Sequence, residues 1–174
     1  MGRLTLILGG ARSGKSALAL RLLLEAPGEK TFVATARIED EEMAERVRAH
    51  REARPPEVKT LEEPLNPVRA LRSADKAEGA ILLDCLTLWL SNLMAEPERD
   101  DALILEEVEE LARASRELQA RLIVVSNEVG MGIIPEGPLA RRFRDLAGRA
   151  NQIMARAADE VLLAVAGIPW RLKP

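Results

Sequence analysis

Runs of apolar residues alternate along the chain with longer stretches in which apolar residues recur every three or four positions. The runs are typical of buried strands, and the spaced pattern is typical of helices that bury one face. Strands are predicted at residues 4–8, 31–35, 79–84, 121–126 and 160–165. Helices are predicted at residues 15–25, 40–54, 103–118 and 139–158.

Strands that are apolar throughout and alternate with one-sided helices indicate an α/β fold, a mostly parallel sheet with helices on both faces. The segment 59–76 contains Pro64 and Pro67, and we expect it to form a loop and one helix. No repeat or linker divides the chain. Residues 1–174 are therefore expected to form a single domain.

The motif Gly-Gly-Ala-Arg-Ser-Gly-Lys-Ser at residues 9–16 matches the pattern G-x-x-x-x-G-K-[ST], between a predicted strand and a predicted helix. Such a loop wraps its backbone N–H groups around a phosphate at the helix N-terminus. Lys15 is expected to reach the outer phosphates, and the Ser16 hydroxyl to bind Mg²⁺. A glycine-rich turn with an incidental lysine is the structural alternative. The motif predicts a P-loop NTPase (RecA-like) fold with its phosphate site at Gly9, Gly10, Ala11, Arg12, Ser13, Gly14, Lys15 and Ser16.

Asp84 ends the predicted strand at residues 79–84. P-loop proteins place an acidic residue that holds Mg²⁺ at the end of such a strand. Asp is also a favoured residue for capping a helix, and a helix could begin just after it. We therefore expect Asp84 to bind the metal together with Ser16, with helix capping as the alternative.

A guanine-reading switch GTPase is not favoured. Such a protein would carry N-K-x-D near the fourth strand, where this chain has Ser-Asn-Glu-Val at residues 126–129. A D-x-x-G match at residues 145–148 lies inside a predicted helix.

His50 allows two interpretations. On the predicted helix it shares a face with Met43 and Val47, which favours a histidine buried in the core. Arg46 and Arg54 lie about one turn on either side of it. Guanidinium groups neutralise phosphate oxygens and so favour a nucleophile that attacks a phosphate. The residues by themselves leave both interpretations open.

The composition narrows the possible partners. The 174 residues are 47% apolar and 30% charged, with a net charge of −3, so no general attraction to nucleic acid or anionic membranes follows. Four aromatic residues are too few for the stacking surfaces that bind single strands. Nucleic acid is therefore not an expected partner.

Cys85 and His50 are the only residues of their types, which excludes an intramolecular disulfide and a zinc site built on cysteines or on a histidine pair. The apolar run at residues 4–8 is too short for a signal peptide or a membrane span. The expected location is the cytoplasm.

Several segments together resemble the bifunctional adenosylcobinamide kinase/adenosylcobinamide-phosphate guanylyltransferase family of cobalamin assembly. They are the P-loop, Ala-Thr-Ala at residues 34–36, Arg-Ala-His-Arg-x-x-Arg-Pro at 48–55, Asn-Glu-Val-Gly-Met-Gly-Ile-Ile-Pro at 127–135, and the segment 139–152. The resemblance extends from residue 4 to about residue 170, and the loop at 57–78 is its least secure part.

The resemblance implies a two-step enzyme. ATP or GTP phosphorylates the hydroxyl of the aminopropanol arm of adenosylcobinamide, and GTP then donates GMP to adenosylcobinamide phosphate with loss of pyrophosphate. The second step passes through a guanylylated histidine, which corresponds to His50. Splitting a transfer between two anions into two displacements suits such a nucleophile. Besides the P-loop, the implied nucleotide contacts are Ala34, Thr35, Ala36, Arg51, Glu52, Ala53, Arg54, Glu62 and Asp84.

The Glu62 carboxylate could accept both edge hydrogens of guanine, although an exposed loop acid is the alternative and Glu63 is equally placed in the sequence. Two other functions remain open: a single-step kinase of another small hydroxyl compound in which His50 is structural, and a nucleotide-gated module without turnover. No role follows for the loop at 127–135, where Gly130 and Gly132 could simply shape a turn.

The chain offers more apolar surface than one sheet layer covers. Residues 86–94 are apolar on nearly every side, and apolar residues recur along the predicted helix 139–158. This surplus predicts a homo-oligomer, which the resemblance implies to be a trimer. A fully buried helix at 86–94 is the competing explanation.

Overall fold

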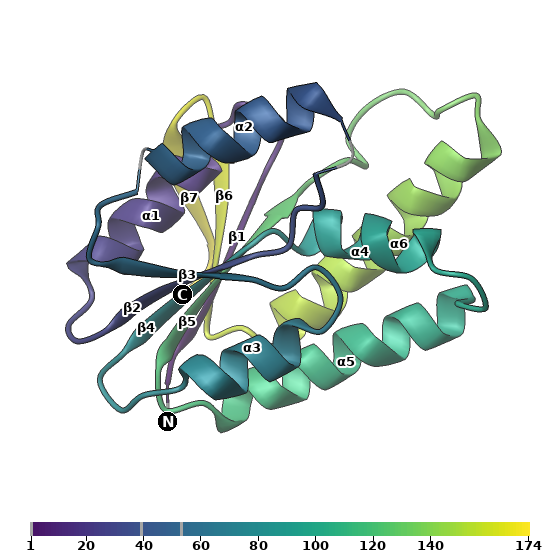
Figure 1. Cartoon of the computed structure of the whole chain (residues 1–174). Helices are drawn as coiled ribbons and strands as arrows, with labels where there is room; N and C mark the ends of the chain where they lie inside the picture. The colour runs from purple at the N-terminus through teal and green to yellow at the C-terminus, as the bar shows by residue number, and fades with distance from the viewer. Residues whose placement is uncertain (1, 39, 53) are drawn as a thin grey trace.

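In the computed structural model, which describes residues 2–38, 40–52 and 54–174, the strands form one sheet in the order β3-β2-β4-β5-β1-β6-β7 (Figure 1). All neighbouring strands pair in parallel except β6 and β7, which are antiparallel. The mostly parallel sheet expected from the apolar runs is confirmed. The strands are β1 (Leu4–Gly9), β2 (Lys30–Ala34), β3 (Val58–Glu62), β4 (Ala80–Asp84), β5 (Arg121–Asn127), β6 (Glu160–Val165) and β7 (Ile168–Lys173).

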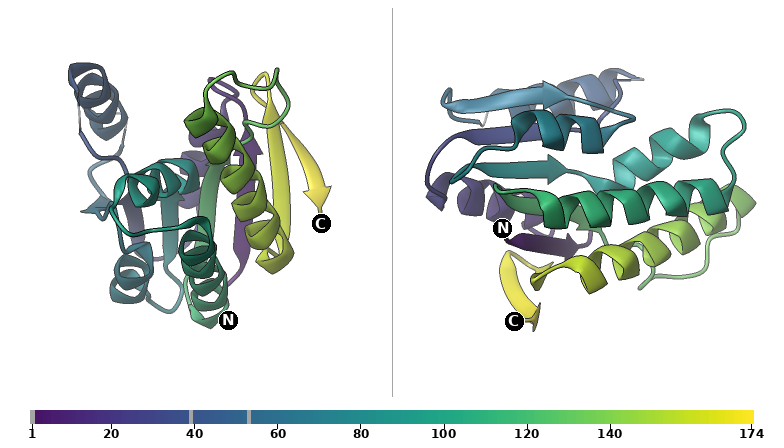
Figure 2. Two further views of the ribbon diagram at one scale, coloured as in Figure 1. Left: turned by 90° about the vertical axis from the view of Figure 1, so that its right-hand side faces the viewer. Right: turned by 90° about the horizontal axis from the view of Figure 1, so that it is seen from below.

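Helices cover both faces of the sheet, as the sequence pattern predicted. Helix α1 packs on one face against the central strands β1, β4 and β5, whereas α3 to α6 lie on the other face (Figures 1 and 2). None of the helices in the described part of the chain has the length and apolar character that a membrane crossing requires. The helices are α1 (Lys15–Glu25), α2 (Glu41–Glu52), α3 (Pro67–Ala74), α4 (Leu86–Ala95), α5 (Asp101–Glu117) and α6 (Pro138–Ala157).

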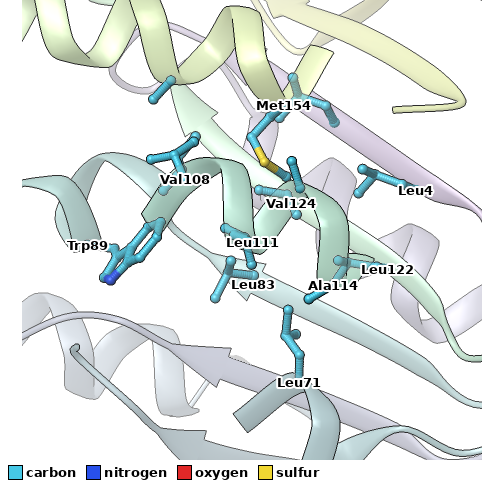
Figure 3. Packing of buried hydrophobic residues seen from close by; sticks show 14 of the residues in the cluster. Leu4, Leu71, Leu83, Trp89, Val108, Leu111, Ala114, Leu122, Val124 and Met154 are labelled. Carbon is cyan, nitrogen blue, oxygen red and sulfur yellow. The ribbon is translucent and has the colours of Figure 1, made fainter. Parts of the chain in front are cut away.

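The sheet divides the apolar core into two clusters, and alternate residues of one strand belong to different clusters. In β5, Leu122 and Val124 pack under α3 to α6, while Ile123 and Val125 pack under α1. This alternation follows from the two-residue period of a strand. Figure 3 shows the larger cluster, in which Leu83, Trp89, Val108, Leu111 and Met154 come from four different elements and meet Val124.

Two strands at the edges of the sheet were not expected. Residues 58–62 form β3 where a loop was predicted, and residues 168–173 form β7. In β3 only Val58 is fully buried, and every residue of β7 is at least partly exposed. Edge strands bury little side-chain surface, so they lack the continuous apolar run by which the buried strands were recognised.

Helix α4 does not contribute to the surplus of apolar surface that was expected from residues 86–94. Leu86, Trp89, Leu90 and Leu93 are at most 1% exposed, so the alternative of a buried helix is right for residues 86–94. The Trp89 Nε1–H also donates a hydrogen bond of 2.9 Å to the Leu65 carbonyl, which satisfies its polar edge. Most of the large apolar side chains that are exposed lie elsewhere, in β7 and the end of β6 and in the segment that leads into α6.

Candidate nucleotide-binding site

The loop between β1 and α1 has a backbone that requires glycine at two positions. Gly14 precedes α1 with φ 90°, and a Cβ there would lie 2.9 Å from the Cα of Gly167 in the β6–β7 turn. A Cβ on Gly9 would lie 2.7 Å from the backbone carbonyl oxygen of Ala164 in β6. The Gly167 N–H donates to the Ser13 carbonyl at 2.9 Å, so the turn also holds the loop. The expected glycine-rich phosphate loop is thus present between a strand and a helix.

Lys15 is the first residue of α1 and is only 9% exposed. Its ammonium group donates a hydrogen bond of 3.0 Å to the Gly10 carbonyl, so the side chain folds back over the loop. A helix N-terminus attracts anions through its unpaired N–H groups and dipole. The lysine therefore adds a full positive charge where the backbone already favours a phosphate.

Beside the loop lies a cleft of about 260 Å³, at the carboxyl ends of β1, β2, β4 and β5. Open α/β sheets bind ligands at this edge. The lining includes six residues that the sequence predicted: Lys15, Ser16, Ala34, Ala36, Arg54 and Asp84. It also includes Phe32, Val47, Cys85 and Leu88, which the sequence analysis missed, and Asn127, whose loop had no assigned role.

The other predicted residues are not among the described residues that line the cleft. Residues 9–14 form the loop itself, and Glu52 ends α2. His50 belongs to α2, but its side chain lies outside the described part of the structure, and Ala53 lies outside the described residues altogether.

Contacts with residues of β2 and β3 hold Arg54 at the cleft. Its guanidinium lies 3.9 Å from the centre of the Phe32 ring, and Nη1 donates to the Thr60 hydroxyl at 2.8 Å. Burial, followed by repulsion from Arg51, lowers the pKa of Arg54, while Asp84 and Glu62 act in the opposite direction. An anion bound here would relieve the repulsion between the two arginines. Arg54 is therefore a cation held in a fixed position at the cleft.

Glu62 and Glu63, which the sequence could not tell apart, have different surroundings. Glu63 Oε1 accepts from the Leu65 and Asn66 N–H groups, and Oε2 pairs with Arg69 at 2.5 Å. Burial opposes ionisation of Glu63, but the Arg69 and backbone hydrogen bonds outweigh it and lower its pKa. Glu62 ends β3 and forms an ion pair with Arg51 of α2. The hydrogen bonds of Glu63 thus hold the turn before α3, and Glu62 remains the candidate for base recognition.

Thr35 joins the ends of β2 and β4. Its hydroxyl donates to the Cys85 carbonyl and accepts from the Cys85 N–H, both at 2.8 Å. The Asn92 amide donates to the Thr35 carbonyl at 2.7 Å. The side chain is fully buried, so Thr35 positions its neighbours Ala34 and Ala36, which do line the cleft.

Asn127 lies at the centre of a second polar network behind the cleft. Its amide donates to the Thr87 hydroxyl at 2.7 Å, and its carbonyl accepts from the Asn151 amide at 3.1 Å. Ser126 in turn donates to Asn151 at 2.6 Å. The sequence contains one signal for this network, the polar residues at the end of an apolar strand. It could not show their partners, which lie on α4 and α6 and are 24 to 40 residues away in the chain.

Comparison with known proteins identifies the family. A family model described as cobinamide kinase / cobinamide phosphate guanyltransferase matches residues 5–172. The chain belongs to this family. The resemblance seen in the sequence motifs is therefore confirmed, and a kinase and guanylyltransferase is supported over a nucleotide-gated module or a switch GTPase.

Three relatives are similar to this chain over almost their full lengths. The bifunctional adenosylcobalamin biosynthesis protein CobP of Pseudomonas aeruginosa is 47% identical over 97% of this chain and 96% of its own. The bifunctional adenosylcobalamin biosynthesis protein CobU of Salmonella typhimurium is 43% identical over 97% and 98%. The Escherichia coli protein of the same name is 38% identical over 97% and 98%.

Solved structures at low identity share the fold. A KaiC-like protein of Pyrococcus horikoshii superposes with a TM-score of 0.54 at 15% identity, covering 93% of this chain and 70% of that chain. A second solved structure, an ATPase domain, has a TM-score of 0.51 at 13% identity, covering 92% and 68%. The fold of this family member is thus that of the P-loop NTPases, as expected from residues 9–16.

The surroundings of Cys85 predict an unreactive thiol. Burial, followed by the charge of Asp84, raises the pKa of Cys85 to about 11. Because the thiolate is the reactive form, a disulfide reagent at about pH 8 should label the folded protein roughly a hundredfold more slowly than the protein unfolded in urea. Rapid labelling of the folded chain would contradict this environment.

The raised pKa of Cys85 also predicts a pH dependence of stability. The free energy of unfolding should fall as the pH rises from about 9 to about 11, because in this range the thiol of the unfolded chain releases its proton and the thiol of the folded chain does not.

Proposed function

We propose that this chain phosphorylates the aminopropanol hydroxyl of adenosylcobinamide with ATP or GTP, and then transfers GMP from GTP to adenosylcobinamide phosphate. The observation that carries the proposal is the cleft that joins Lys15, Ser16, Arg54 and Asp84 in a chain whose family match covers residues 5–172. Assays of the two half-reactions with adenosylcobinamide test it. A chain that catalyses neither half-reaction would refute it.

In the kinase step the substrate oxygen attacks the γ-phosphorus, the bond from that phosphorus to the β-bridging oxygen breaks, and the hydroxyl proton is released. Little covalent chemistry is required of the protein, so positioning and charge neutralisation carry the step. The N–H groups at the start of α1 and the Lys15 ammonium supply positive charge around the phosphates. Arg54 adds a second side-chain cation to the cleft lining.

The residues that line the cleft suit Mg²⁺. Magnesium prefers oxygen ligands and commonly binds through one or two protein groups together with phosphates and water. The Ser16 hydroxyl and the Asp84 carboxylate both line the cleft. Among the described residues, no group of three acidic, histidine or cysteine side chains could hold a metal without such help. Bound there, Mg²⁺ would neutralise phosphate charge, and Ser16 and Asp84 would hold it.

In the guanylyl transfer a neutral histidine attacks the α-phosphorus of GTP, and the bond to the bridging oxygen of pyrophosphate breaks. An oxygen of adenosylcobinamide phosphate then displaces the histidine. Val47 lines the cleft, and positions three residues apart share a face of a helix. Position 50 of α2 thus lies on the face that contributes Val47, which supports His50 as the nucleophile.

Glu62 is the proposed acceptor for guanine. A carboxylate can accept the hydrogens on both N1 and N2 of the base, whereas Glu63 already accepts from two backbone N–H groups and Arg69. Arg51, the ion-pair partner of Glu62, belongs to the same helix as His50. The base and the nucleophile would therefore be positioned by one helix and the end of β3.

The proposed setting is the cytoplasm, and the proposed partners are small molecules. The one cysteine of the chain is a free, buried thiol, which suits a reducing compartment. Lys15 and Arg54 line a cleft of about 260 Å³, and the net charge of −3 gives no general affinity for nucleic acid.

Labelling with GTP tests the nucleophile. GTP labelled at the α-phosphate should leave acid-labile, base-stable label on the protein in the presence of Mg²⁺, as expected of a phosphoramidate. His50→Asn keeps a polar side chain but removes the nucleophilic nitrogen, so labelling and guanylyl transfer should be lost. Phosphorylation of adenosylcobinamide should persist in part, because that step needs no protein nucleophile. Stable labelling of the variant would return His50 to a structural role.

The two neighbouring glutamates provide a matched pair for testing base recognition. Glu62→Gln should reduce the preference for GTP in the transfer step by roughly one to two decades, because an amide must present a donor to one of the two guanine hydrogens. ATP-supported phosphorylation should change little. Glu63→Gln, one residue further on, should leave the nucleotide preference unaltered. Equal preferences in Glu62→Gln and the parent protein would remove Glu62 from guanine recognition.

We propose a homo-oligomer, with a trimer as the expected state, assembled through β7. Val165, Ile168, Trp170 and Leu172 are 50 to 70% exposed at this edge of the sheet. An exposed apolar edge strand favours association with another chain. Light scattering should give an oligomer for the parent protein and a smaller mass for Trp170→Glu. A monomeric parent protein at micromolar concentration would contradict the proposal.

A further inference from the structure

The nucleotide cleft is too small to contain the whole of the second substrate. Its volume of about 260 Å³ lies just below the range of roughly 300–1,000 Å³ typical of pockets for drug-sized ligands. A nucleotide in this cleft would fill it. The corrin macrocycle of cobinamide, with its rim of methyl and amide groups, must therefore lie on the surface outside while the aminopropanol arm reaches inward.

An exposed apolar surface begins at the rim of this cleft. We use the name apolar loop for residues 129–139, which follow β5 after Glu128 and lead into α6. Met131, Ile133, Ile134 and Leu139 are 79, 97, 66 and 68% exposed, and Glu136 is the only charged residue of the loop. Four large apolar side chains at such exposure in one short segment indicate a surface that binds a ligand or another protein chain.

The apolar loop is tied to the nucleotide site at its start. Asn127 lines the cleft, and the next N–H, that of Glu128, donates to the carbonyl of Gly9 in the phosphate loop at 3.0 Å. In the left view of Figure 2, this segment and α2 rise on opposite sides of the carboxyl-end edge of the sheet. A substrate whose arm enters the cleft would therefore have its bulk beside this segment.

Both ends of the apolar loop are held, while its middle can adapt. The Gly130 N–H donates to the Glu128 carboxylate at 2.7 Å, and Arg141 of α6 donates to the Pro135 carbonyl at 2.9 Å. A Cβ on Gly132 would meet nothing within 4 Å, so packing does not require glycine there. Glycine and an unbranched methionine give the centre of the loop freedom to fit an irregular face.

We propose that the apolar loop is the docking surface for the corrin macrocycle of adenosylcobinamide, with Ile133 and Ile134 as its main contacts. The proposal rests on the proposed function, since it assigns the part of the substrate that lies outside the cleft. The macrocycle offers methyl groups to the apolar side chains and amide groups to the loop backbone. The other exposed apolar group, on β7, lies along a strand that runs away from the carboxyl-end edge.

A double variant tests the docking surface. Ile133→Ser with Ile134→Ser removes apolar area from two exposed positions, so the fold should be retained, as circular dichroism would verify. Equilibrium dialysis with adenosylcobinamide, followed by its visible absorbance, should show at least about a tenfold weaker affinity. Binding of a fluorescent GTP analogue should stay within about twofold of the parent value, because the nucleotide contacts are untouched. The control Leu103→Ser, at an exposed position of α5 outside both the cleft lining and the apolar loop, should alter neither affinity.

The outcomes separate the docking surface from the function on which it rests. A parent protein that neither binds nor phosphorylates adenosylcobinamide would refute the function itself. A parent protein that does both, with an unchanged affinity in the double variant, would overturn only the docking surface. A double variant with normal corrinoid affinity and a changed oligomeric mass, measured by light scattering, would instead assign the loop to a subunit contact and overturn the proposal.

Discussion

The close contact between Gly14 and Gly167 is the constraint on which the site depends. A Cβ on Gly14 would lie 2.9 Å from the Gly167 Cα, so the phosphate loop can lie against the β6–β7 turn only without a side chain there. The left-handed backbone at Gly14 also sets the direction in which α1 begins. Strand β1 lies between β5 and β6, and its last residue, Gly9, is in register with Asn127 and Ala164. The phosphate loop therefore begins between the ends of these two strands.

Positive and negative charges offset one another at the site proposed for the nucleotide phosphates. Arg51 and Arg54 repel one another, which contributes to the lowered pKa of Arg54, and the carboxylates of Glu62 and Asp84 offset this repulsion. The Phe32 ring and the Thr60 hydroxyl hold Arg54 in place and leave it little conformational freedom. Nucleotide phosphates can take over part of the neutralising role, since oxyanions pair with guanidinium groups at least as well as carboxylates do.

The two substrates make different demands on the protein surface, and the sites proposed for them are separate. The nucleotide is polyanionic and suits a cleft lined by Lys15, Arg54 and polar side chains. The corrinoid carries a broad, partly apolar ring, and the exposed side chains of the apolar loop offer a matching surface. Asn127 connects the two regions, because its side chain lines the cleft and its network reaches α4 and α6.

The sequence by itself determined the buried strands, the phosphate loop and the placement of Asp84 at the end of β4. Each of these depends on residues close together in the chain, so spacing and apolar runs identify them. Only the tertiary structure decided that β3 and β7 are strands, because edge strands take their hydrogen bonds from a neighbour and bury little surface. It also decided that α4 is buried, since its cover comes from β5, α5 and α6. The choice between Glu62 and Glu63 likewise depended on partners in space, Arg51 for one and the turn before α3 for the other.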